Sequence, residues 1–201
     1  MEEGEHPQRL STHMTTISSH SFGQSCQTGD DEDGLTIHII ENMQEDYGMF
    51  VWPCSIVLAE YVWQQRPRFL GMTVVEVLEN MRKTSDLNNL NCKILGLTWG
   101  EWDAPLFSLN PKILLGADVL YDTNDFDDLF ATVTFLLQNC PDSVFITTYH
   151  NRSGHHLIEY LMVKWGLKCT KLVDAFSFMP SLKASTLRGN IQLVEMTLGH
   201  H

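Results

Sequence analysis

The sequence has few basic residues, no closely spaced cysteines and no long apolar run. Lysine and arginine number 13 against 25 acidic residues, for a net charge of -12. This balance argues against a free-standing nucleic-acid binder, because neutralising phosphates requires clustered basic side chains. No apolar run approaches the roughly 18 residues of a membrane span, and the first residues are acidic where a signal peptide is basic. We expect an intracellular protein of the cytoplasm and nucleus, with basic proteins as partners and with no direct nucleic-acid or membrane partner.

The cysteines and histidines lack the spacing of a metal site. The five cysteines are an odd number without a Cys-x-x-Cys pair, so we interpret them as reduced and structural. Three histidines invite a metal interpretation: His150, His155 and His156. However, His155 and His156 are adjacent and would point about 100° apart on a helix, and no cysteine or third histidine has ligand spacing to them. We therefore expect no bound metal.

The chain has 201 residues, of which 43% are hydrophobic, and this length and composition are typical of one globular domain. Residues 1–34 differ, because they hold seven acidic residues and a single basic one, Arg9. Such a segment cannot bury enough apolar surface to offset the entropy of ordering it. We expect a disordered acidic tail over 1–34 and a folded domain over 35–199.

Strand patterns alternate with helical patterns from residue 35 onward. Strands are expected over 35–41, 72–77, 93–99, 112–119, 143–149, 167–173 and 190–198, and helices are expected to begin at Trp52-Pro53, near Leu78, at Thr123 to Asp125 and at Ser153. This alternation predicts an α/β fold, with an open, mostly parallel sheet and helices on both faces. The last two strands are joined by a loop and should form an antiparallel pair at one edge.

Ligands of such sheets bind beyond the carboxyl ends of the strands, where Asp118 and Tyr121 follow an apolar strand. The Asp118 carboxylate could orient an amine or a guanidinium and accept its proton, or it could simply cap the following turn. Trp52 and Trp99 each precede a turn residue, so either indole could face a planar ligand or pack in the core.

Three separated motifs carry a family resemblance: YGMFVWPCSIVLAEYV (47–62), LGLTWGEWD (95–103) and ADVLYD (117–122). They closely resemble the S-adenosylmethionine-dependent methyltransferases of family 16, and the segments TYHNRS (148–153) and KWGLKC (164–169) extend the match. The resemblance implies a Rossmann-like sheet and a cofactor site lined by Trp52, Trp99 and Ala117. It also implies that Asp118 and Tyr121 lie beside the substrate nitrogen.

The resemblance further implies the reaction, which is methyl transfer from the cofactor sulfonium to a protein side chain. Lysine is the general acceptor of the family. Arginine, including histone arginine, is the acceptor implied by the nearest match within it. The expected partner is therefore a protein substrate, either a histone or another basic protein.

One part of the family pattern is missing. After the first strand such folds carry a glycine-rich turn, a helix and a second strand with an acidic end. Here Val77 continues directly into Leu78, and no glycine lies between Gly71 and Gly96. The family pattern would hold about thirty further residues, one α/β unit, between Val75 and Leu78. We expect weak or lost cofactor binding and a sheet reduced by one unit.

The missing unit leaves two alternatives for the sheet and two for the function. The first and third strands could become neighbours in a six-strand sheet, or the sheet edge could stay unpaired. The chain could be a protein methyltransferase with impaired cofactor binding. Alternatively, it could be a non-catalytic methyltransferase-fold binding or regulatory protein that arises as a splice variant.

Overall fold

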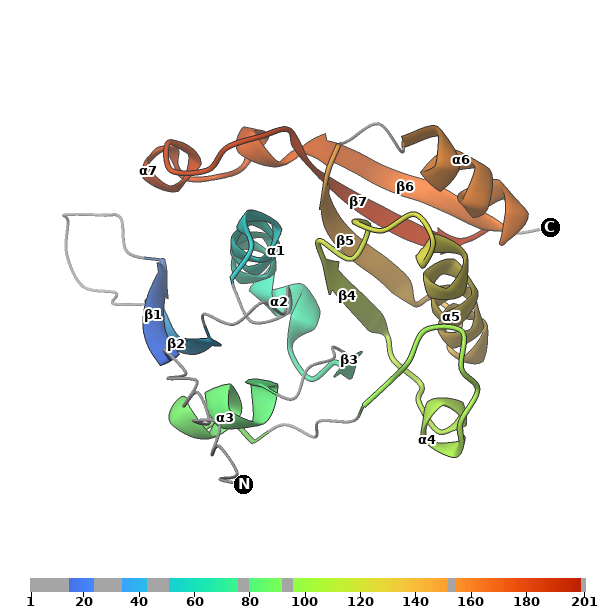
Figure 1. The fold of residues 1–201 in the computed structure, drawn as a ribbon, viewed down its shortest axis with the longest axis horizontal. Coiled ribbons are helices and arrows are strands. Elements are labelled where there is room, and N and C mark those ends of the chain that lie inside the picture. The colour runs from blue at the N-terminus through green and yellow to red at the C-terminus, as the bar shows by residue number, and fades with distance from the viewer. Residues whose placement is uncertain are drawn as a thin grey trace, which may run out of the picture.

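The structure is a computed structural model that describes residues 15–23, 34–42, 51–75, 80–91, 96–151 and 155–199. These residues form a mixed α/β fold with a five-stranded sheet and a separate two-stranded ribbon (Figure 1). The strands are β1 (Thr15–Phe22), β2 (Leu35–Asn42), β3 (Val74–Val75), β4 (Ile113–Ala117), β5 (Val144–His150), β6 (Leu167–Asp174) and β7 (Ile191–Leu198). The helices are α1 (Pro53–Gln64), α2 (Arg66–Phe69), α3 (Asn80–Leu87), α4 (Ala104–Phe107), α5 (Phe126–Asn139), α6 (His155–Lys164) and α7 (Ser181–Ala184).

The five-stranded sheet has the order β3-β4-β5-β7-β6. β4 pairs with β3 and β5 in parallel, whereas β7 pairs with β5 and β6 antiparallel. The prediction of a mostly parallel sheet is therefore wrong for the described strands, because half of the pairings are antiparallel. The predicted antiparallel pair at one edge is confirmed as β7 and β6. Its connection is more than a loop, since it contains a short 3₁₀ turn (Ala175–Ser177) and α7.

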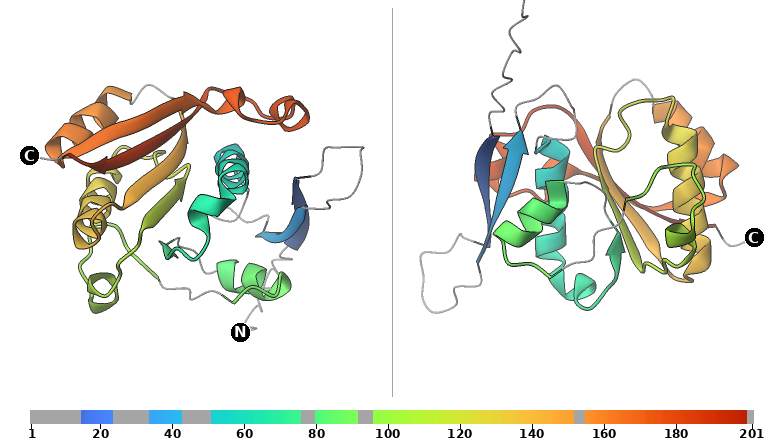
Figure 2. Two further views of the ribbon diagram at one scale, coloured as in Figure 1. Left: turned by 180° about the vertical axis from the view of Figure 1, so that it is seen from behind. Right: turned by 60° about the horizontal axis from the view of Figure 1, so that its bottom comes forward.

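Helices cover both faces of this sheet, as the alternation of side chains in β5 requires. Val144 and Ile146 pack with Leu58 and Tyr61 of α1 on one face. Phe145 packs in the cluster that α5 and α6 cover on the other face. Figures 1 and 2 show α1 and the α5–α6 pair on opposite sides of the strands. The prediction of helices on both faces is confirmed.

The ribbon of β1 and β2 overturns part of the predicted disordered tail. β1 pairs antiparallel with β2 from Thr15 to Phe22, and Phe22 is only 4% exposed. The Phe22 ring centroid lies 6.3 Å from that of Trp63 in α1, and the Lys183 ammonium lies 4.1 Å from the Phe22 centroid. Disorder is therefore wrong for residues 15–22, because pairing and burial of Phe22 compensate for their polar composition. The other tail residues, 1–14 and 24–33, lie outside the described part.

The region of the missing unit is short. β3 ends at Val75 and α3 begins at Asn80, which leaves four residues between them. Residues 96–99 of the predicted strand 93–99 are not in a strand, and 92–95 lie outside the description. Of the two alternatives for the sheet, the described residues match the unpaired edge, because β3 pairs only with β4 there; part of the third predicted strand lies outside the described residues.

The segment that follows β3 packs on the ribbon, since α3 contacts β2 and Asn88 directly follows α3. The side-chain amide of Asn88 donates to the His38 carbonyl oxygen at 2.6 Å, and its oxygen accepts from the His38 N–H at 2.8 Å. These two hydrogen bonds connect the end of the segment that follows β3 to β2.

Two smaller predictions also have an outcome. The predicted cap of α6, Ser153, lies outside the described residues. Among the helices of the described part, none combines the length and apolar character needed to cross a membrane.

Candidate functional site

Asp118 follows the last residue of β4 at the carboxyl edge of the parallel strands. Its φ of 56° is in the left-handed region, and its N–H donates to the Thr148 carbonyl oxygen of β5 at 2.8 Å. Side chains pack closely on the strand just before this point, at Gly116. A Cβ at Gly116 would meet Val119 at 2.9 Å. This local geometry directs the chain over the end of the sheet.

One oxygen of the Asp118 carboxylate is buried without a hydrogen-bond partner among the described residues. The residue is 9% exposed, and within the described part of the chain its Oδ1 atom is fully buried and accepts no hydrogen bond. A buried polar atom without a partner is costly and uncommon in folded proteins. The turn-cap interpretation would require a backbone N–H on this carboxylate, and no such bond is present among the described residues.

Two further side chains lie beside Asp118. The sulfur of Cys54, a carboxylate oxygen of Asp118 and a ring nitrogen of His150 all lie within 4.8 Å of one another. They come from the first turn of α1, the end of β4 and the end of β5. The Thr148 hydroxyl donates to the Cys54 carbonyl oxygen at 2.8 Å and so ties the start of α1 to β5. We call these three residues the donor cluster.

Three of the predicted site residues lie close in sequence to members of the donor cluster. Ala117 precedes Asp118 and packs, half-buried, against the cluster of Leu58 and Tyr61. Trp52 is the N-cap residue of α1 and lies two residues before Cys54. Tyr121 is 56% exposed just beyond Asp118.

Trp99 packs elsewhere, against the hydrophobic cluster that α5 covers. The next residue, Gly100, donates its N–H to the Thr132 hydroxyl of α5 at 2.9 Å. The described contacts of Trp99 are therefore with the α5 side of the molecule, whereas Ala117 packs on the α1 side.

Sequence reasoning missed Cys54 and His150 as members of one cluster. The sequence predicts that the cysteines are structural, and its metal interpretation groups His150 with His155 and His156. The usable signal was position, because His150 ends a strand and Cys54 follows the proline that opens a helix. Their separation along the chain hid their proximity.

A buried polar network holds α1 against the sheet. Glu195 of β7 accepts two hydrogen bonds from Arg68 at 2.9 and 2.8 Å and one from the Tyr61 hydroxyl. The Lys171 ammonium contacts the Tyr61 oxygen at 3.0 Å. Burial by itself would raise the pKa of Glu195, but the hydrogen bonds from Arg68 and Tyr61 outweigh it, so its pKa lies below 4.5. The network fixes the helix whose first turn carries Cys54.

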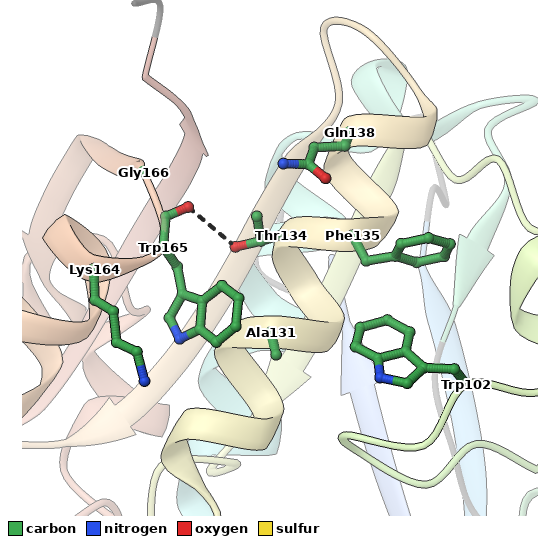
Figure 3. A pocket seen from close by; sticks show the side chains of 8 residues that line it. All are labelled: Trp102, Ala131, Thr134, Phe135, Gln138, Lys164, Trp165 and Gly166. Atoms are coloured by element: carbon green, nitrogen blue, oxygen red, sulfur yellow. Dashed lines mark hydrogen bonds between the residues drawn. The ribbon is translucent and has the colours of Figure 1, made fainter.

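A separate hollow of about 400 Å³ lies over α5 (Figure 3). Figure 3 shows Trp102 and Phe135 on one side of it and Trp165 with Lys164 on the other. Lys164 is already paired with Asp127 at 2.7 Å, and the Trp165 indole N–H donates to the same carboxylate at 2.9 Å. The Lys164 ammonium and the Asp127 carboxylate thus neutralise each other. This hollow is therefore a weaker candidate for a ligand site than the end of β4.

Comparison with known proteins matches the chain to curated relatives over most of its length, although it matches no protein-family model. It is 37% identical to "Histone-arginine methyltransferase METTL23" of Xenopus laevis, over 72% of the chain and 75% of the relative. Identity to the Mus musculus protein of that name is 32%, over 82% of the chain and 78% of the relative. Identity to the Homo sapiens protein is 32%, over 74% of the chain and 95% of the relative.

The lengths of these matches also show how many positions of each relative have no counterpart in the chain. The Xenopus match spans 175 aligned positions but uses 72% of the 201 residues, about 145, so about 30 positions of the relative have no counterpart here. The human match spans 181 positions and uses 74%, about 149 residues, which leaves a similar difference. The difference equals the size of the expected missing unit. With identities above 30% to relatives covered over three quarters of their length or more, the chain belongs to the METTL23 family of methyltransferases.

Proposed function

We propose that this chain is an S-adenosylmethionine-dependent protein methyltransferase by descent, with a retained acceptor side and impaired cofactor binding. The observation that carries the acceptor side is the Asp118 carboxylate at the end of β4, whose Oδ1 atom is buried and accepts no hydrogen bond in the described part of the chain. The five-stranded sheet is then a reduced form of the open Rossmann-like methyltransferase sheet. The acceptor is arginine or lysine, and the names of the relatives favour arginine.

The chemistry of Asp118 suits a cationic acceptor. A carboxylate without an internal partner can receive hydrogen bonds from a guanidinium or ammonium group and compensate its charge. Tyr121, which is exposed three residues later, is proposed to border the path to this carboxylate. The net charge of -12 favours basic protein substrates, and histones or other basic proteins of the cytoplasm and nucleus are the proposed partners.

The residues present do not fit the whole cofactor. Trp52 and Ala117 lie on the α1 side, but a glycine-rich turn, a helix and a strand cannot be built from the four residues between β3 and α3. None of those four is glycine. Backbone that approaches a nucleotide closely depends on glycine, so this half of the site is missing. We therefore derive no reaction step through the cofactor in this chain.

A calorimetric titration with S-adenosylmethionine tests the proposal. The chain should bind at least about tenfold more weakly than a restored chain that carries, after Val75, the corresponding residues of the Xenopus relative. Two recognition elements are lost, and each tenfold is about 1.4 kcal/mol. A Gly-Ser insertion of equal length is the matched control and should not restore binding. Equal affinities of the chain and the restored chain would contradict the proposal.

The second candidate function is a non-catalytic binding or regulatory protein with a methyltransferase fold. It is favoured by the absence of the cofactor half beside an assembled acceptor side. In that case an arginine-rich histone peptide should bind this chain equally well with and without S-adenosylmethionine. An enzyme with weak cofactor binding should instead methylate that peptide at saturating cofactor.

A further inference from the structure

The donor cluster offers an explanation for the Asp118 Oδ1 atom, which is buried and has no hydrogen-bond partner among the described residues. A buried carboxylate oxygen without a hydrogen bond is expensive unless a cation compensates it. Within the described part of the chain, the side chains that share donor distances with it are Cys54 and His150. A thiolate, a carboxylate and an imidazole in one place are the ligand types of a transition-metal site.

The distances between the three donor atoms are close to those between ligand atoms around a tetrahedral ion. Zn²⁺ binds sulfur at about 2.3 Å and nitrogen or oxygen at about 2.0–2.2 Å, so tetrahedral ligand atoms are about 3.3–3.8 Å apart. The three donor atoms lie within 4.8 Å of one another. A side-chain movement of about 1 Å brings them to coordination distance.

The chemistry selects zinc over the hard cations. Calcium and magnesium take oxygen ligands, whereas Zn²⁺ accepts sulfur, nitrogen and oxygen together. A thiolate and a carboxylate supply two negative charges, which balance the ion when the imidazole is neutral. Three protein ligands leave a fourth position for water.

The backbone around the cluster is held by hydrogen bonds centred on Thr148. Its carbonyl oxygen accepts from the Asp118 N–H, and its hydroxyl donates to the Cys54 carbonyl oxygen. His150 lies in β5 opposite Ile191 of β7. A Cβ at Gly189 would lie 2.9 Å from His150 Nδ1, so the chain before β7 packs directly on the imidazole. The ligands therefore stand on a prearranged frame, as a metal site requires.

We propose that Cys54, Asp118 and His150 bind one Zn²⁺ ion at the carboxyl edge of β4 and β5. Cys54 is fully buried, which suits a metal ligand and does not suit a nucleophile that must reach a substrate. The site shares Asp118 with the proposed acceptor side, so a bound ion would compete there with a cationic acceptor. Its test reads metal binding, so its failure is distinct from failure of the proposed function.

The test is titration of Zn²⁺ and of Co²⁺ into the full chain after removal of metals with a chelator. Calorimetry should give one tight Zn²⁺ per chain, and Co²⁺ should give the near-ultraviolet absorption of a cobalt–thiolate bond. Cys54→Ser should abolish that absorption. Both Cys54→Ser and His150→Gln should weaken Zn²⁺ binding by about tenfold or more.

Matched controls separate this site from other thiols and imidazoles. Cys169→Ser and His156→Gln change exposed residues away from the cluster and should leave the affinity unchanged. The double variant Cys26→Ser/Cys92→Ser should also bind as the parent does. Because Cys54→Ser could unfold the chain, His150→Gln with an unchanged melting curve provides the second variant. The proposal is overturned if no tight site is found, if His150→Gln binds as the parent does, or if Cys169→Ser removes the cobalt–thiolate absorption.

Discussion

Asp118 is the residue with the strongest signal for function at the scale of single side chains. Its backbone is in the left-handed region, its N–H is bound to Thr148, and its Oδ1 atom is buried and unpartnered in the described part of the chain. Uncommon backbone geometry beside an uncompensated charge is a combination that functional sites retain. Asp122, four residues later, shows the ordinary alternative, since its carboxylate accepts from the Asn124 N–H at 2.9 Å.

Asp118→Asn should lower the rate of methyl transfer by about a hundredfold or more in the restored chain, the scale of losing one preorganised electrostatic group. Asparagine keeps the shape and tolerates a positive φ, so the melting temperature should change little. The measurement is a methylation assay with a histone peptide, beside a thermal melt. Asp122→Asn is the control and should leave the rate near that of the parent. An intact rate with a melting point lower by several degrees would instead support a turn-capping role.

Whole elements are joined through Glu195, which connects β7 with α1 and α2 by way of Tyr61 and Arg68. Glu195→Gln keeps the side-chain shape but removes the negative charge that accepts hydrogen bonds from Tyr61 and Arg68. We expect a loss of about 1–2 kcal/mol at neutral pH, a value reduced because Arg68 is partly exposed. Thermal or urea unfolding checks it, with the exposed Glu159→Gln on α6 as a control that should have little effect.

The same carboxylate predicts a pH dependence. Its pKa is lowered in the folded state from the ordinary 4.5, so its stabilising contribution is complete above that value. The contribution is lost as the pH falls below 4.5 and through the lowered folded-state pKa. The difference in melting temperature between the parent and Glu195→Gln should therefore shrink in this acidic range. A difference that stayed constant with pH would show that the charge is not responsible.

The ribbon of β1 and β2 docks on α1 through Phe22. Phe22→Ala removes a buried ring and should cost about 3 kcal/mol, which lowers the melting temperature of a protein of this size by about 6 °C or more. Ile17→Ala, on the same strand but 60% exposed, should have almost no effect. Comparable small effects of both substitutions in thermal unfolding would mean that the ribbon does not contribute to the folded core.

The whole molecule has a sheet that ends at β3, a strand of two residues that pairs only with β4 in the described part. An unpaired sheet edge is a template for association. The restored chain should therefore melt at a higher temperature and begin to aggregate later on heating than the present chain. Light scattering during a thermal ramp, with the Gly-Ser insertion as control, measures this. Earlier aggregation of the restored chain would show that β3 is not the vulnerable edge.

Much of the fold could be predicted from local patterns. Trp52-Pro53 opens α1, the apolar run 112–119 contains β4, and acidic residues mark the start of α5. Proline placement, negative charge at a helix start and hydrophobic period all act within a few residues. The three motifs placed the chain in a methyltransferase family, and the identity with METTL23 proteins bears this out. The absence of a glycine-rich turn was also visible in sequence.

Only the tertiary structure decided which residues meet. Three features depend on contacts between distant segments. Phe22 packs on Trp63, Asn88 after α3 binds His38 of β2, and β7 pairs antiparallel with β6. The donor cluster is the clearest case, because Cys54, Asp118 and His150 belong to three elements. Local propensity carries no information about such pairings, whereas parallel packing of β4 against β5 beneath α1 brings all three to one edge.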